Sequence, residues 1–436
     1  MAIPATQVPT VIHRLRAWLK HWGPILPLLI AESTIWLGFG ALLPILPIYY
    51  TRHGVDLPTL GIVVAAWPAA RLFAEPLFGW VADRASRKRM MMTGLLLAAV
   101  VAVLPLFWVG PLAFIVARAL AGMFAAVYDP AARGYLVDAN PPEKQGETFG
   151  LYGSAQTGGF MVGPAVGGLA AAAAGDPTVV FWVCGIALLV SAVLVAWRLP
   201  ERARIGGHEP APVVAGEPGL GNAPSSIMNR LFFVAVVLNV AAFLAGGTYE
   251  VVWSLYLTSL GATIAVIGVS FFTFALPVML LSPFTGRYVD RHGGYLALTV
   301  GLAGVALCGI GYTLIPSVLW VVLLGLVEGS AFAFASPALF LLVSRASPAG
   351  RASTAQGIFG AAGTMGTVVA SITAGAMAQV DLRLPFIATG TTALIVLIAG
   401  VALGGRRLWP AMQPSHLGPA PDPARSAAAE PADGTS

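Results

Sequence analysis

The feature that most constrains the fold is a series of apolar runs, each long enough to cross a lipid bilayer. A membrane-spanning helix needs about 20 apolar residues, and the 436-residue sequence contains twelve such runs. With 57% hydrophobic and 10% charged residues, and a mean hydropathy of +0.82, the chain has too little polar surface for a water-soluble globule. We therefore predict an all-α integral membrane protein. The predicted spans lie near residues 24–50, 58–82, 89–108, 111–137, 147–174, 177–198, 229–258, 264–289, 295–314, 317–344, 351–378 and 383–403.

Basic residues predict the orientation of these spans, because lysine and arginine accumulate in cytoplasmic loops. With both termini inside, all but four of the 24 lysines and arginines fall in cytoplasmic segments or at cytoplasmic helix ends. The exceptions are Arg52 and Arg383 outside and Arg71 and Arg118 within spans. We expect a multi-pass protein of the plasma (inner) membrane with both termini cytoplasmic. Its net charge of +5 then faces anionic lipid and indicates no nucleic-acid partner.

A segment rich in glycine and proline, residues 199–228, divides the chain into two halves. Such a composition predicts a flexible linker, here cytoplasmic, between a bundle at 24–198 and a second bundle at 229–403. Residues 1–23 carry interleaved basic and apolar side chains, which predict an amphipathic segment on the membrane surface. Residues 404–436 are expected to form a disordered cytoplasmic tail.

The two halves are repeats of one another at a constant offset of 207 residues. No shift is needed over a hundred positions, and the matches include a charged Asp-Arg pair that chance among small residues does not explain. The matching pairs are Gly54 and Gly261, Gly61 and Gly268, Pro76 and Pro283, Gly79 and Gly286, Asp83-Arg84 and Asp290-Arg291, Gly122 and Gly329, Pro130 and Pro337, and Gly150 and Gly357.

The loop after the second run carries the most specific motif. Gly79 precedes Asp83-Arg84 by four residues, and a basic cluster follows from Arg87. A plain cytoplasmic loop would explain the basic cluster but neither Asp83 nor its spacing from Gly79. This stretch resembles the signature of the major facilitator superfamily, with Ser86 where that family usually has glycine. The resemblance implies twelve transmembrane helices in two pseudo-symmetric six-helix bundles and a small-molecule substrate bound between them.

The first run contains Leu37-Gly38 followed by Pro44 and Pro47, which is similar to a motif of the twelve-span drug:proton antiporter branch of the family. Proline late in a membrane helix also removes a backbone hydrogen bond and bends the helix. A bend is therefore expected whether or not the resemblance carries function.

The fifth run contains five residues that match the antiporter motif of the family: Gly159, Gly163, Pro164, Gly167 and Gly168. Glycines at intervals of four leave one helix face bare, so another helix can approach closely. Tight packing alone would explain the glycines. The resemblance adds an association with exporters.

The fourth run resembles the arginine motif of the family, which is implicated in proton transfer, with Arg118 and Gly122 in place and Ala121 where glutamine is usual. Asp129 lies eleven residues after Arg118, about 16 Å along a helix, so the two side chains are not expected to pair. By resemblance, Asp129 belongs to a charge cluster that latches the halves. The predicted gating residues are Gly79, Asp83, Arg84, Arg87, Asp129, Asp290, Arg291 and Arg351.

Four carboxylates lie inside spans, where each costs about 2.5–3.5 kcal/mol on insertion scales and is therefore usually functional. Glu75 lies one turn from Arg71, so an internal ion pair is its simplest explanation. Glu32 has no basic residue within a turn and shares a helix face with Trp36. This makes Glu32 the leading candidate for binding a proton or a cationic substrate.

Two further carboxylates and one amide complete the candidate site. Glu250 lies beside Tyr249 and Trp253, which suit an amphipathic cation through cation–π contact, although an interfacial role also explains it. Glu328 has two open explanations, proton coupling and an inter-helix hydrogen bond. Asn239 occupies the repeat position of Glu32, so the seventh span is polar at the same depth.

These features predict a secondary active transporter, namely a proton-coupled exporter of small amphipathic or drug-like compounds that works as a monomer. A carrier of a specific metabolite, sugar or siderophore is the alternative on the same fold, and a non-transporting sensor or scaffold is a more distant one. The sequence has no GxxxxGK[ST] phosphate loop, no catalytic constellation and no metal-ligand cluster, and both cysteines lie in apolar runs. We therefore predict no enzyme activity, cofactor or metal.

Overall fold

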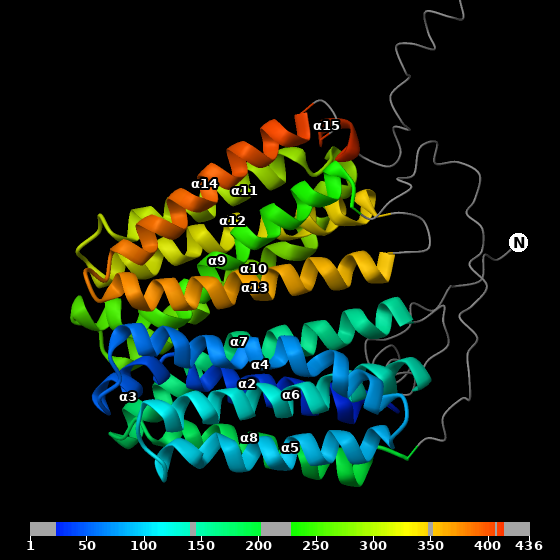
Figure 1. Cartoon of the computed structure of the whole chain (residues 1–436), viewed down its shortest axis with the longest axis vertical. Coiled ribbons are helices and arrows are strands. Elements are labelled where there is room, and N and C mark those ends of the chain that lie inside the picture. The colour runs from blue at the N-terminus through cyan, green and yellow to red at the C-terminus, as the bar shows by residue number, and fades with distance from the viewer. Residues whose placement is uncertain (1–22, 140–144, 202–227, 348–351, 406–407, 414–436) are drawn as a thin grey trace, which may run out of the picture. The chain divides into compact units, whose positions relative to one another are not determined.

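The computed structural model describes residues 23–139, 145–201, 228–347, 352–405 and 408–413. The predicted surface segment, most of the predicted linker, Arg351 and the tail beyond residue 413 lie outside these residues. The described residues form helices and no strand, which confirms the predicted fold class (Figure 1). The helices are α2 (Leu26–Leu42), α3 (Leu46–Arg52), α4 (Leu57–Ala82), α5 (Arg87–Val103), η1 (Leu104–Leu106), α6 (Pro111–Ala139), α7 (Gln145–Ala174), α8 (Val179–Arg198), α9 (Arg230–Ser259), α10 (Ile264–His292), α11 (Tyr295–Tyr312), α12 (Val318–Ala346), α13 (Ala352–Ala378), α14 (Leu384–Gly404) and α15 (Leu408–Ala411).

Eleven helices of the described chain are long and apolar enough to cross a membrane. The pair α2 and α3 passes the same test together, with a bend of 42° between them. The break falls at residues 43–45, where Pro44 lacks the N–H that would continue the helix and its ring clashes with the preceding turn. The first predicted span is therefore one broken span, and the total agrees with the twelve that the sequence predicts.

Glycines bring α2 and α7 together, as the motif in the fifth run predicts. A Cβ added to Gly163 would lie 2.7 Å from the Cα atom of Gly40. One added to Gly159 or Gly167 would collide with backbone atoms of α2. The bare face of α7 therefore lies directly against α2, and this close approach decides which side chains of the two helices meet.

Equivalent glycine contacts recur in the two halves. A Cβ on Gly94 of α5 would lie 3.0 Å from the carbonyl oxygen of Phe124 in α6. A Cβ on Gly301 of α11 would lie 2.7 Å from the carbonyl oxygen of Ala331 in α12. Both members of the second pair lie 207 positions after their counterparts. The repeat that the sequence predicts is therefore also a repeat of helix packing.

The chain forms two compact units. The first joins the described part of Met1–Ala211 with Gly247–Phe272 and Ser371–Leu382, and the second holds the described remainder. Each unit therefore has a core of its own. The domain boundaries at residues 198 and 229 stay a prediction from the sequence.

Two glycine pairs join helices within the first unit. A Cβ on Gly168 of α7 would lie 2.8 Å from the Cα atom of Gly268 in α10, and one on Gly375 of α13 would lie 2.9 Å from the Cα atom of Gly61 in α4. The offset of 207 converts Gly61 into Gly268 and Gly168 into Gly375. The two contacts are thus the same contact made twice by the repeat.

The second unit contains a core to which the end of the described chain contributes. Leu408 and Met412 are buried in it, and the carbonyl oxygen of Met412 accepts a hydrogen bond of 2.8 Å from the backbone N–H of Gly294. The ordered chain therefore extends beyond residue 403, where the tail was expected to begin. The reason is that Leu408 and Met412 lie one turn apart and form a single apolar face.

Candidate functional site

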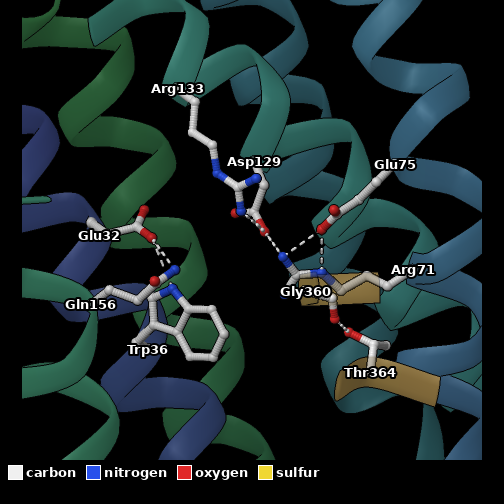
Figure 2. Close-up of polar contacts among 9 residues, drawn as sticks. All are labelled: Glu32, Trp36, Arg71, Glu75, Asp129, Arg133, Gln156, Gly360 and Thr364. Carbon is white, nitrogen blue, oxygen red and sulfur yellow. Dashed lines mark hydrogen bonds and ion pairs between the residues drawn. The ribbon is translucent and has the colours of Figure 1, made fainter. Parts of the chain in front are cut away.

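Glu32 is fully buried in the first unit and accepts hydrogen bonds from three side chains, one each on α2, α6 and α7. The indole N–H of Trp36 donates to its Oε1 atom at 2.8 Å, the amide of Gln156 donates to the same atom at 3.0 Å, and the hydroxyl of Tyr128 donates to Oε2 at 2.8 Å. Figure 2 shows Glu32 with Trp36 and Gln156. Trp36 contacts Glu32, as their spacing on α2 predicts. The glycine row of α7 lets that helix lie close to α2, so the side chain of Gln156 on α7 reaches Glu32.

All three donors to Glu32 are uncharged. In the part of the chain that the structure describes, Glu32 forms no ion pair with a basic side chain. The hydroxyl of Tyr152 is also close enough to interact with it electrostatically. Glu32 is therefore a buried carboxylate that neutral groups solvate, as the sequence predicts from the lack of a nearby cation.

A separate ion cluster lies between α4 and α6 (Figure 2). Arg71 donates to Glu75 on its own helix at 2.7 Å and also pairs with Asp129, which is buried. Arg133, one turn beyond Asp129, lies 4.0 Å from the same carboxylate. The expected pair of Arg71 and Glu75 is present. Arg71 and Arg133 together supply two positive charges for these two carboxylates, so the negative charges are compensated in place.

A second ion pair joins α6 to the part of α9 that belongs to the first unit. The Nη2 atom of Arg118 lies 2.5 Å from the Oε1 atom of Glu250 and 3.5 Å from the carbonyl oxygen of Val64. Arg118 does not pair with Asp129, as the helix spacing predicts. The guanidinium groups of Arg118 and Arg71 lie 5.9 and 5.1 Å from the ring centre of Trp67.

The candidates in the second unit are also buried. Asn239 donates from its amide to the carbonyl oxygen of Phe359 at 2.8 Å, so it stabilises the packing of α9 on α13. Glu328 accepts a hydrogen bond of 2.6 Å from the hydroxyl of Tyr312. This contact supports the inter-helix hydrogen bond that the sequence left open beside proton coupling.

Replacing Tyr312 with phenylalanine is expected to destabilise the protein, because it removes this donor from a buried carboxylate. A hydrogen bond to a charged group contributes about 1.5–3 kcal/mol. The measurement is the thermal midpoint of the detergent-solubilised protein, with Tyr288→Phe as control because Tyr288 is exposed. Equal midpoints for the two variants would show that the hydroxyl of Tyr312 contributes nothing to stability.

The predicted gating residues do not all meet in this structure. Arg87 pairs with Asp138 at 3.0 Å, Arg84 donates to the carbonyl oxygen of Trp80, and Asp129 is held by Arg71. At the equivalent end of α10, Asp290 and Arg291 are exposed, and Arg351 lies outside the described residues. A gating role for this set stays a prediction.

Sequence reasoning missed three residues of the site, namely Tyr128, Gln156 and Trp67. Gln156 is a polar residue in an apolar run, three positions before the glycine motif, and this signal was available. Tyr128 and Trp67 carry no such signal, because aromatic residues are common in membrane helices. Their roles come from helix packing over long sequence distances.

Comparison with known proteins places this chain in a transporter family. A sequence model described as the Major Facilitator Superfamily matches residues 28–249 and again 231–431. The Quinolone resistance protein NorA of Staphylococcus aureus is 28% identical over 228 residues, which are 51% of this chain and 55% of NorA. The chain therefore spans about half the length of this curated relative. An uncharacterized MFS-type transporter of Methanocaldococcus jannaschii is 24% identical over 362 residues, or 80% of this chain and 90% of that protein.

Solved structures share the fold at low sequence identity. A bacterial homolog of the human lysosomal transporter Spinster, in an inward-facing and occupied conformation, has a TM-score of 0.72 and 13% identity, covering 89% of this chain and 97% of that one. The nucleoside transporter NupG has a TM-score of 0.66 and 16% identity, covering 87% and 98%. Identities this low support a common fold and say nothing about substrate.

Proposed function

Because the chain belongs to the Major Facilitator Superfamily, we propose that it is a proton-coupled exporter of small amphipathic compounds, in which Glu32 exchanges a proton for substrate. The supporting relative is named a quinolone resistance protein, so planar drug-like compounds are the first substrates to test. The chain would act as a monomer in the plasma membrane, with both termini in the cytoplasm.

The observation that carries the proposal is the contrast between Glu32 and three other carboxylates of the first unit. Glu75, Asp129 and Glu250 each pair with an arginine, so protonating any of them would weaken an ion pair of Arg71 or Arg118. Glu32 has only neutral donors. Binding a proton to Glu32 therefore removes the cost of burying an uncompensated charge.

Exchange at Glu32 would also suit a substrate that carries a positive charge. A cation near Glu32 and a proton on Glu32 compensate the same charge, so the two compete for one site. Trp36 offers its ring beside the carboxylate, in edge contact with Phe160 at a centroid distance of 5.6 Å. The ring face and the carboxylate together would favour an amphipathic cation over a neutral sugar.

The test uses inside-out vesicles from cells that express the protein, acidified inside and followed with a pH-sensitive dye. Quinolones, lipophilic cations and metabolites are added in turn, to wild type and to Glu32→Gln. We expect at least one amphipathic compound to release protons from wild-type vesicles and none to do so with Glu32→Gln. If only a single metabolite moves protons, the narrow-carrier alternative is correct, and proton release that survives in Glu32→Gln would exclude Glu32 as the exchanging group.

A further inference from the structure

A small cavity lies within the first unit, between the residues around Glu32 and the ion cluster of Arg71. Trp36, Trp67, Arg71, Tyr128 and Asp129 all line it. Its volume is about 10 Å³, counted as the space open to the centre of a water molecule. The cavity therefore borders both the residues around Glu32 and the ion cluster of Arg71.

The volume determines what the cavity can hold. About 10–15 Å³ of such space accommodates one water molecule, and a stable buried water needs two to four polar partners. A drug-sized substrate is far too large. Three of the lining residues, Asp129, Tyr128 and Arg71, carry polar side chains that can serve as such partners.

Trp67 provides a second and independent observation. Its indole nitrogen is buried and has no hydrogen-bond partner in the described protein. Leaving a buried donor unsatisfied costs about 1–3 kcal/mol, and such groups are usually satisfied by ordered water. The same side chain lines the water-sized cavity. The donor that lacks an acceptor and the space for a water molecule therefore belong to the same residue.

Packing fixes Trp67 in this position. A Cβ on Gly122 of α6 would collide with the carbonyl group of Trp67, so the two backbones are in direct contact. The indole ring lies within 6 Å of the guanidinium groups of both Arg71 and Arg118 and makes edge contact with Trp36 at a centroid distance of 6.5 Å. The indole N–H is therefore held in place before any ligand binds.

We propose that this cavity binds one ordered water, which accepts a hydrogen bond from the indole N–H of Trp67 and donates to Asp129 and to the hydroxyl of Tyr128. Tyr128 already donates to Glu32, so the water completes a hydrogen-bonded chain from Glu32 to Asp129. Trp67 is the positioning residue of this chain. This inference rests on the proposed function in one respect. If Glu32 exchanges protons, the hydrogen-bonded chain links Glu32 to the ion cluster of Arg71.

The hydrogen-bonded chain would couple the protonation of Glu32 to the ion cluster of Arg71. When Glu32 takes up a proton, Tyr128 loses a charged acceptor, and the change is transmitted through the water to the carboxylate of Asp129. Charged groups on both facing helices then respond, namely Arg71 and Glu75 on α4 and Arg133 on α6. Tyr152 of α7 is the other titratable group that faces Glu32.

Radiolytic hydroxyl-radical labelling of the purified full-length protein tests the water directly. Ordered waters give radicals in place, so side chains beside them are oxidised even when they are buried. We expect Tyr128 to be oxidised at least five times faster than Tyr256, which is an equally buried tyrosine outside the cavity lining. Oxidation of Tyr128 at the rate of Tyr256 would overturn the proposal.

A variant tests the role of Trp67. Trp67→Phe keeps an aromatic ring but removes the N–H, so we expect at least a threefold loss of labelling at Tyr128 and a changed pH profile of proton release. Trp108→Phe is the matched control, because Trp108 is exposed and lies outside the cavity. Unchanged Tyr128 labelling in Trp67→Phe would refute the positioning role.

The two experiments separate this inference from the proposed function. Labelling requires no transport, so a positive result on a protein that releases no protons would keep the water and reject proton exchange. Proton release from a protein in which Tyr128 is labelled only at the control rate would keep proton exchange and reject the water.

Discussion

Arg118→Met is expected to reduce transport at least 30-fold and to lower the stability of the protein. The guanidinium of Arg118 compensates Glu250 at 2.5 Å, and the two side chains keep only 11% and 20% of their exposure. Removing one partner of a buried pair leaves the other charge uncompensated, which costs about 3–5 kcal/mol when burial is complete. Because Glu250 keeps some contact with solvent, we expect a loss of roughly 2 kcal/mol.

A double variant separates the charge effect from simple loss of packing. Arg118→Met combined with Glu250→Gln removes both charges, so it should regain most of the lost stability while transport stays low. Thermal midpoints and vesicle transport give the two readouts, and Arg52→Met is the control because Arg52 is exposed at the end of α3. Additive effects of the two substitutions would show that the pair is not coupled, and wild-type transport by Arg118→Met would remove the pair from the mechanism.

Features that depend on a single helix or on the repeat could be predicted from the sequence. The apolar runs predict the helices, Pro44 predicts the bend after α2, and the offset of 207 relates the equivalent packing that the structure shows at Gly94 and Gly301. Each of these needs only local composition or a comparison of the chain with itself. The glycine row of the fifth run is an intermediate case, since it predicts a close helix contact but not that α2 makes it.

Partners across helices could not be predicted in this way. Tyr128 and Gln156 donate to Glu32 from 96 and 124 positions along the chain, and spacing within one helix contains no information about such contacts. Asp129 shows the same limit. Resemblance to the family places Asp129 with the loop after α4, whereas in this structure it pairs with Arg71, because α4 and α6 are in backbone contact at Gly122.

Gly168→Val is expected to reduce the transport rate at least tenfold while the protein still folds. The Cβ position of Gly168 is 2.8 Å from the Cα atom of Gly268, which is closer than real side chains tolerate, so α7 and α10 would have to separate there. The contact lies in the C-terminal half of α7 and is repeated by Gly61 and Gly375. Alternating access in this family moves one half of the chain against the other, so a contact made once by each repeat is a natural closing point of the cycle.

Gly158→Val provides the matched control, because the Cβ position of Gly158 on the same helix has no atom within 4 Å. Both variants add the same side chain to α7, so helix propensity and hydrophobicity cancel in the comparison. We expect Gly158→Val to transport within twofold of wild type. We also expect Gly61→Val, which disrupts the repeat-related contact, to resemble Gly168→Val. If Gly168→Val transports like its control, the close approach of α7 and α10 is a packing feature that the transport cycle does not need.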